Sequence, residues 1–257
     1  MRIKSAYKYQ LNELLKPVMV YYIIIAALSV LTVVAAKLWM TGGSISGWDG
    51  ATIIFLFICG LSAFKASFHM FMANGISRKA MFIGTITAIA TVAIGMALID
   101  GVIGLVLNLL IPYNSVFANQ YAGWYGIHWN GLFDNFRETA PMVADGVVWR
   151  ISSYTAAAMT GLFLTTAFYR MNKPVKLLVS IGVPVLLLIV WPIVDATVFN
   201  GAMTAAVLRA FGWVSSLFTN LLGTGNPYIV VLYNVFWILL LGGLTWLLTR
   251  RATVKTQ

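Results

Sequence analysis

Long apolar runs constrain this chain more than any other feature. They reach the ~20 residues that an α-helix needs to cross the hydrocarbon core of a bilayer. Transmembrane β-strands would instead alternate apolar and polar residues. The sequence therefore predicts an all-α polytopic membrane protein, with one transmembrane domain over residues 1–257. The six expected spans cover residues 17–40, 51–73, 80–112, 144–169, 177–198 and 228–248.

Charge sets the expected orientation. Only 9% of the residues are charged, whereas a soluble domain carries about 25%. The net charge of +10 fits the excess of Lys and Arg in cytoplasmic loops, so we expect no nucleic-acid partner. Both termini are then cytoplasmic. The basic residues in the expected cytoplasmic segments are Arg2, Lys4, Lys8, Lys16, Arg78, Lys79, Arg170, Lys173, Lys176, Arg250, Arg251 and Lys255.

Three segments outside the spans are expected to lie at the membrane surface. Residues 1–16 place their apolar side chains on one helical face, which predicts an amphipathic helix on the inner surface. A frayed basic tail is the alternative. Residues 113–142 are rich in aromatic side chains, which favour the interface. We expect an outer interfacial or re-entrant helix there, and a second outer helix within residues 200–226.

Two of the spans are expected to be irregular. A helix over residues 80–112 would rise about 48 Å at ~1.5 Å per residue, which exceeds the hydrocarbon thickness. We expect it to tilt, project outward, or break at Asp100 and Gly101. In the span over residues 177–198, Pro184 and Pro192 predict kinks.

Signatures of soluble enzymes are absent. The chain has no G-x-x-x-x-G-K-[ST] motif, so it cannot hydrolyse ATP through a P-loop of its own, and it has no H-E-x-x-H motif. Its single cysteine, Cys59, excludes an intrachain disulfide and a cysteine-cluster metal site. We therefore expect no catalytic residues, no metal and no cofactor in this chain.

A short basic turn joins the second and third spans. The positive-inside rule places it in the cytoplasm, and we call it the 74–79 turn. An ordinary positive-inside loop is the alternative to a docking role. Its residues are Asn74, Gly75, Ile76, Ser77, Arg78 and Lys79.

Polar residues within spans are costly and mark candidate functional positions. Ser62, Lys65 and His69 recur at helical spacing on the second span, so they are expected to form a polar stripe. The stripe faces a cavity or a partner in one interpretation. In the other, Lys65 extends towards the inner surface.

Three further charges are expected at one depth near the outer surface. Counted from the inner end of its span, each lies about 29 Å away at ~1.5 Å per residue. We predict that Arg150 pairs with Asp100 or Asp195, as an external gate or a structural clasp. The alternative is three separately solvated residues.

A ladder of small residues follows one face of the fourth span. Small side chains let helices approach closely in lipid, so we expect helix packing here rather than a substrate path. The ladder consists of Ser153, Ala157, Gly161 and Thr165.

The whole pattern resembles the permease subunits of ABC-2 type ABC transporters. The resemblance rests on the helix before the first span, six spans with both ends inside, the 74–79 turn, and helical material in residues 200–226. The small size and the Asn-Gly-Ile-Ser-Arg-Lys wording resemble short permeases of Gram-positive bacteria, several of which act in peptide export or immunity. The 113–142 segment has no counterpart in that pattern.

The resemblance implies a multi-pass permease of a bacterial cytoplasmic membrane that exports an amphipathic or peptide-like substrate. ATP and magnesium would bind a separate ATPase subunit, and residues 72–82 would form a coupling helix in a groove of that ATPase. Two permease chains would pair as a homodimer or heterodimer. The alternatives are a non-transporting immunity or sensor protein that binds a peptide or partner in the bilayer, and an ion- or proton-coupled carrier.

Overall fold

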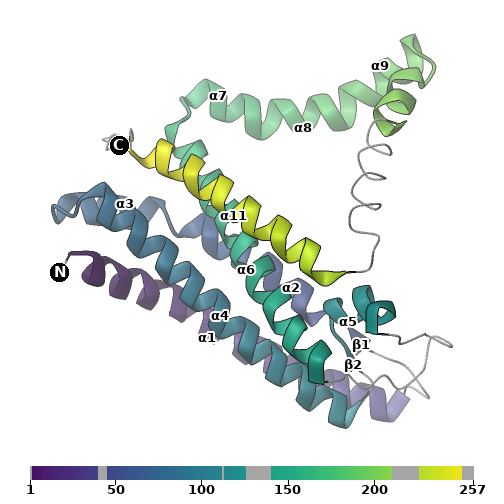
Figure 1. The fold of residues 1–257 in the computed structure, drawn as a ribbon. Coiled ribbons are helices and arrows are strands. Elements are labelled where there is room, and N and C mark those ends of the chain that lie inside the picture. The colour runs from purple at the N-terminus through teal and green to yellow at the C-terminus, as the bar shows by residue number, and fades with distance from the viewer. Residues whose placement is uncertain (1, 40–44, 112, 126–139, 210–225, 251–257) are drawn as a thin grey trace. The chain divides into compact units, whose positions relative to one another are not determined.

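The computed structural model describes residues 2–39, 45–111, 113–125, 140–209 and 226–250, which are almost entirely helical (Figure 1). They fall into two compact units. Unit 1 comprises Met1–Ala167 with Pro227–Gln257, and unit 2 comprises Phe168–Asn226. The single domain over residues 1–257 stays a prediction, and each unit is described separately below.

Unit 1 contains six long or medium helices and a small region of extended chain. Two-residue strands β1 (Ile45–Ser46) and β2 (Tyr113–Asn114) pair in parallel. The short α5 (Val116–Tyr121) follows β2. The main helices are α1 (Arg2–Trp39), α2 (Trp48–Ser62), α3 (Lys65–Ala73), α4 (Arg78–Leu110), α6 (Ala140–Arg170, of which the last three residues belong to unit 2) and α11 (Pro227–Arg250).

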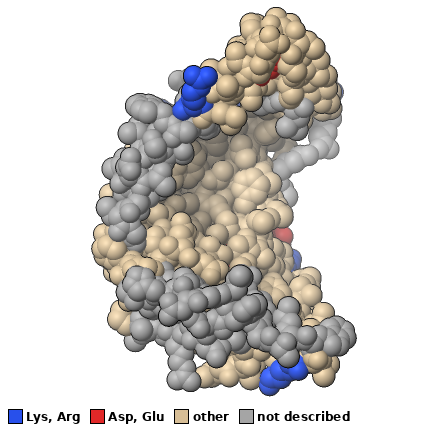
Figure 2. All heavy atoms as spheres, turned by 90° about the vertical axis from the view of Figure 1, so that its right-hand side faces the viewer, with Lys and Arg blue, Asp and Glu red and all other residues tan. Residues whose placement is uncertain are grey.

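Among the described residues, four helical segments are long and apolar enough to cross a membrane. They are Ile3–Leu38, Trp48–Ala73, Arg78–Leu110 and Pro227–Arg250. The chain is therefore a membrane protein with transmembrane helices. Figure 2 shows a face on which the described surface is almost free of charged side chains. Large apolar side chains such as Ile23 and Leu109 are 70% and 85% exposed, as contact with lipid requires.

One expectation about helix boundaries is wrong. Residues 1–16 do not form a separate helix, because α1 continues through Pro17 and is one helix of 38 residues. Helix α4 continues through Asp100 and Gly101, so the break, one of the three alternatives for that span, does not occur. Gly101 is buried instead, and a Cβ atom there would contact the side chains of Val147 and Arg150 of α6. A glycine there serves close helix contact rather than interruption.

Helices α1 and α4 lie side by side and run in the same direction (Figure 1). Near one end Gly84 lies against Ala6, and further along both helices the Tyr22 hydroxyl donates to Asp100. In contrast α2 runs antiparallel to α1. The amide of Gln10 bonds the carbonyl of Ala63, while Tyr21 near the middle of α1 contacts Thr52 at the start of α2.

Helix α6 packs between α2 and α11 and runs parallel to both. Towards α2, the contacts progress from Asp49 with Arg150 to Leu61 with Thr165. Towards α11, they progress from Tyr228 with Asp145 to Trp237 with Thr160. These directions follow from the contacts alone: α1 and α4 run one way, and α2, α6 and α11 run the other.

The small-residue ladder serves close packing, as expected. A Cβ atom on Gly161 would overlap the carbonyl oxygen of Phe57, and one on Gly60 would overlap that of Ala158. The Thr165 hydroxyl donates to the Leu61 carbonyl at 2.5 Å. Backbones of α2 and α6 therefore touch directly, as small residues allow in membrane helix pairs.

Part of the aromatic 113–142 segment packs into unit 1. Phe117 and Tyr121 of α5 are buried with Met142 and Trp149 of α6. The expected interfacial helix is thus partly a core element, although Trp124 in the following short 3₁₀ helix is 45% exposed. His128, Trp129, Phe133 and Phe136 lie outside the described residues.

In unit 2, the helix over residues 177–198 is irregular near Pro184 and Pro192, where the sequence predicts kinks. α-Helical pieces α7 (Lys173–Leu177), α8 (Val183–Val185) and α9 (Trp191–Val198) alternate with π-helical turns at Leu178–Gly182 and Leu186–Val190. Pro184 and Pro192 each follow a π-helical turn closely. A proline lacks the backbone N–H and crowds the preceding turn, so a widened turn is a common accommodation.

Candidate functional site

An ion pair between Arg150 and Asp49 forms the centre of a buried polar network in unit 1. The Arg150 Nε atom lies 2.8 Å from Asp49 Oδ2, and both side chains are 2% exposed. Asp49 lies in the first turn of α2, where a carboxylate also meets the positive end of the helix dipole. The other Asp49 oxygen accepts a 2.8 Å hydrogen bond from the hydroxyl of Tyr113 in β2.

Burial and the Asp49 carboxylate together raise the pKa of Tyr113 far above its ordinary value. A raised tyrosine pKa keeps the hydroxyl protonated, so Tyr113 donates to Asp49 at any physiological pH. Both carboxylate oxygens of Asp49 thus have a donor. A buried charge that is paired and hydrogen-bonded in this way avoids most of the cost of burial.

Asp100 of α4 forms the second part of the network. Its Oδ1 accepts from the Tyr22 hydroxyl of α1 at 2.8 Å, and its Oδ2 accepts from the Tyr154 hydroxyl of α6 at 2.5 Å. Asp100 is 8% exposed and Tyr154 is completely buried. Arg150 and Tyr154 are four residues apart on α6, so one face of that helix reaches both carboxylates.

Two of the three residues of the predicted outer charge cluster lie in unit 1. Asp100 and Arg150 do lie in one buried network, but the carboxylate in the described ion pair of Arg150 is Asp49. Asp49 precedes the expected span over residues 51–73 and is not among the predicted partners. Tyr22, Tyr113 and Tyr154 were also missed. In the expected topology Tyr22 lies near the inner end of its span and Tyr113 lies beyond the outer end of another, so the depth count does not group them with Asp100.

Asp195 takes a different role from the one expected. It lies in unit 2, where its two carboxylate oxygens accept from the backbone N–H groups of Met203 and Thr204, each at 2.9 Å. Residues 202–209 are helical, so Asp195 satisfies free donors at the start of that helix. Its predicted pairing with Arg150 stays a prediction, because the two residues belong to different units.

Asp145 of α6 accepts hydrogen bonds from two tyrosines, as Asp100 of α4 does. Asp145 accepts from the hydroxyl of Tyr125 at 2.6 Å and from that of Tyr228 at 2.7 Å. Burial and this hydrogen bond raise the pKa of Tyr125, so it too remains a donor. Asp145 therefore ties the start of α11 to the start of α6.

The polar stripe of Ser62, Lys65 and His69 does not lie on one continuous helix. Ala63 and Phe64 separate α2, which ends at Ser62, from α3, which begins at Lys65. Ser62 donates to the Cys59 carbonyl at 2.9 Å within its own helix. The ring of His69 packs edge-on to Phe68. The Lys65 side chain lies outside the described part.

At the opposite end of unit 1, the 74–79 turn is a compact connection capped on both sides. Gly75 has a φ of +65°, the left-handed conformation that glycine adopts most easily. The N–H of Gly75 bonds the Met72 carbonyl, and that of Ile76 bonds the Phe71 carbonyl. This pair of bonds is the Schellman motif that ends α3. Ser77 then caps α4 by accepting from the N–H of Ala80.

The predicted coupling helix over residues 72–82 is not a helix of its own. Residues 72 and 73 end α3, residues 74–77 form the turn, and α4 begins at Arg78. Ile76 and Arg78 are half-buried, whereas Lys79 is exposed. Arg78 donates to the Arg250 carbonyl at the end of α11 at 2.7 Å. The turn is thus held against a neighbouring helix.

The first residues of α1 lie at the same end of unit 1. The rings of Tyr9 and Phe71 pack edge-on with centroids 5.4 Å apart, and Ala6 lies against Gly84. The start of α1, the 74–79 turn and the end of α11 therefore meet at one end. Basic residues on these three elements include Lys4, Lys8, Arg78, Lys79 and Arg250.

No family model, curated protein or solved structure matches the chain. Among the described residues, no group of three or more His, Cys, Asp or Glu side chains is placed to hold a metal ion. The candidate site of unit 1 therefore has two parts. One is the buried ionic network, and the other is the capped basic 74–79 turn at the opposite end.

Proposed function

We propose that this chain is the membrane-spanning subunit of an exporter driven by a separate ATPase, and that the 74–79 turn receives the mechanical input. The observation that carries the proposal is the construction of the turn. It is fixed by caps at both ends and by the bond from Arg78 to Arg250, yet it presents the exposed cation of Lys79. A rigid basic surface suits docking to an acidic partner better than a loose loop does.

The position of the turn supports transmission of a push. It connects α3 directly to α4, a helix of 33 residues that extends about 49 Å at ~1.5 Å per residue. Helix α4 in turn carries Asp100, which is bonded to both α1 and α6. A displacement of the turn would therefore reach the buried network through one continuous helix.

The orientation belongs to the same proposal. In unit 1 the basic ends of α1, α4 and α11 lie together, and positive charge collects on the cytoplasmic side of membrane proteins. We place this end in the cytoplasm, with both termini inside and six spans in all. In this proposal the complex also contains an ATPase subunit and another permease chain. It lies in a bacterial cytoplasmic membrane and exports an amphipathic or peptide-like substrate.

Co-purification tests the proposal. The tagged full chain is extracted with its natural partners in mild detergent, and bound proteins are identified by mass spectrometry. We expect a P-loop ATPase in the wild-type sample, and its loss when Ile76→Asp and Lys79→Glu are combined. Lys37→Glu reverses a charge at the other end of α1 and serves as the control, so it should retain the ATPase. Absence of any ATPase from the wild-type sample would favour the non-transporting immunity or sensor protein.

A further inference from the structure

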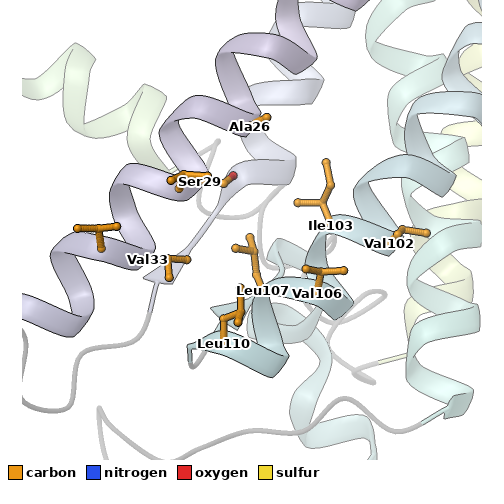
Figure 3. Close-up of a pocket in the computed structure, with 10 residues that line it drawn as sticks. Ala26, Ser29, Val33, Val102, Ile103, Val106, Leu107 and Leu110 are labelled. Carbon is orange, nitrogen blue, oxygen red and sulfur yellow. The ribbon is translucent and has the colours of Figure 1, made fainter.

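An apolar cavity of about 360 Å³ lies between helices α1 and α4 (Figure 3). Nine of its ten lining side chains are aliphatic, and the tenth is Ser29. Figure 3 shows labelled side chains of both helices around one space, with Val33 on α1 and Val106, Leu107 and Leu110 on α4. The volume falls within the ~300–1,000 Å³ range of ligand pockets.

The cavity opens sideways at the molecular surface. Val30 of α1 and Val102 of α4 line it and are 65% and 59% exposed. Both belong to segments that are long and apolar enough to cross a membrane. The medium at this opening is therefore the bilayer, and a lipid acyl chain has direct access to a cavity whose lining matches it chemically.

The side chain of Lys37 follows the cavity lining along α1. Lys37 follows Val30, Val33 and Val34 on α1 at helical spacing, so it continues the face that lines the cavity. It is exposed and lies about 5 Å beyond Val34 along the helix axis at ~1.5 Å per residue. The facing helix α4 ends at Leu110, which also lines the cavity. Lys37 is thus placed where a lipid headgroup would lie if its chain filled the cavity.

We propose that this cavity binds one acyl chain of an anionic phospholipid, with the Lys37 ammonium next to the phosphate. The aliphatic lining binds the acyl chain, and the charge of Lys37 favours an anionic headgroup. Zwitterionic lipids also carry a phosphate, but their ammonium group opposes a lysine, so the anionic class is favoured. This inference depends on the lining residues and on Lys37, and it is independent of the proposed ATPase.

Native mass spectrometry tests the site. The full chain is placed in phosphatidylcholine discs that hold a minor share of phosphatidylglycerol, and the lipids retained after ejection are counted. The wild type should retain one phosphatidylglycerol. Lys37→Gln should lower its retention about fivefold, the contribution of one lysine near an anionic surface. Lys8→Gln removes a charge from the other end of α1 and should leave retention unchanged.

A second pair of variants tests the cavity itself. Val106→Phe and Val102→Phe each place a ring in the cavity and should abolish retention of the lipid. Leu109→Phe adds the same ring at a residue of α4 that is 85% exposed and outside the cavity, so retention should not change. Equal retention of phosphatidylcholine and phosphatidylglycerol by the wild type would overturn the proposal. So would retention that survives both filling variants, or a dimer that only the filling variants dissociate, because a second copy would then be the occupant.

Discussion

Arg150 and Asp49 are 101 residues apart in the chain and form an ion pair of 2.8 Å in the interior of unit 1. The pair joins α6 to α2, and Tyr113 adds β2 through its bond to Asp49. Asp100 extends the same network to α1 and α4. Four helices and one strand thus meet at this network. Removing one partner of the buried ion pair would leave an unpaired charge in the interior, which costs much stability.

Breaking this ion pair should destabilise the protein strongly. Arg150→Met leaves the Asp49 carboxylate buried without its cation, which costs roughly 3–5 kcal/mol. The free energy of unfolding, measured by SDS titration in mixed micelles, should fall by that amount. Combining Arg150→Met with Asp49→Asn should recover part of the loss. The exposed pair of Glu13 and Lys16 is the control, because Lys16→Ala should cost less than about 1 kcal/mol.

Removal of a single hydroxyl that donates to Asp100 should also lower the free energy of unfolding measurably. Tyr154→Phe deletes a fully buried donor to a carboxylate, and hydrogen bonds to charged groups contribute about 1.5–3 kcal/mol. The same unfolding titration applies. Adding Asp100→Asn to Tyr154→Phe should lessen the loss, since a neutral amide tolerates the missing donor better. Two losses that simply add would mean that the hydroxyl and the carboxylate are not coupled.

Two glycines should respond to alanine in opposite directions. Gly161→Ala places a methyl group on the Phe57 carbonyl and must push α6 away from α2, so the unfolding temperature should drop. Gly95 lies within α4 with no atom near its virtual Cβ, so Gly95→Ala should raise stability by up to about 1 kcal/mol through helix propensity. A neutral Gly161→Ala variant would show that the helices are not in backbone contact there.

The role of Asp195 in unit 2 can be tested locally. Asp195→Ala removes the acceptor for the N–H groups of Met203 and Thr204, so their amide hydrogens should exchange faster with solvent. The ion-pair interpretation predicts instead that the change propagates to the surroundings of Arg150. Hydrogen-exchange mass spectrometry on peptides from both regions separates the two results.

Much of the helical structure of unit 1 could be predicted from the sequence, because the length of an apolar run and the residues that end it are local signals. The span ending near Leu248 and the turn with Gly75 and Ser77 are examples, since each depends on a few adjacent residues. The continuity of α1 and α4 was missed for a physical reason. Pro17 and Gly101 lower helix propensity locally, but tertiary contacts such as Gly84 with Ala6 and Tyr22 with Asp100 stabilise the helices around them.

The ionic network shows the other limit of sequence reasoning. The depth estimate placed Asp100 and Arg150 at one level, but the choice of partner depends on which helices are neighbours. Asp49 lies outside the expected span over residues 51–73, in the first turn of α2, and is not among the predicted partners. Asp49 and Tyr113 both lie outside the expected spans, so a count of residues along those spans does not bring them to the level of Asp100.

The central claim is that the 74–79 turn docks to an ATPase, and site-specific cross-linking tests it most directly. Cys59 is the only cysteine and is buried, so a Cys59→Ala background makes Lys79→Cys the single thiol. A thiol-reactive photocrosslinker attached there in native membranes should join the chain to a protein with a P-loop, and the same label at Lys37→Cys should not. Labelling of Lys79→Cys from the external side of intact cells, or an absence of any ATPase adduct, would contradict the account.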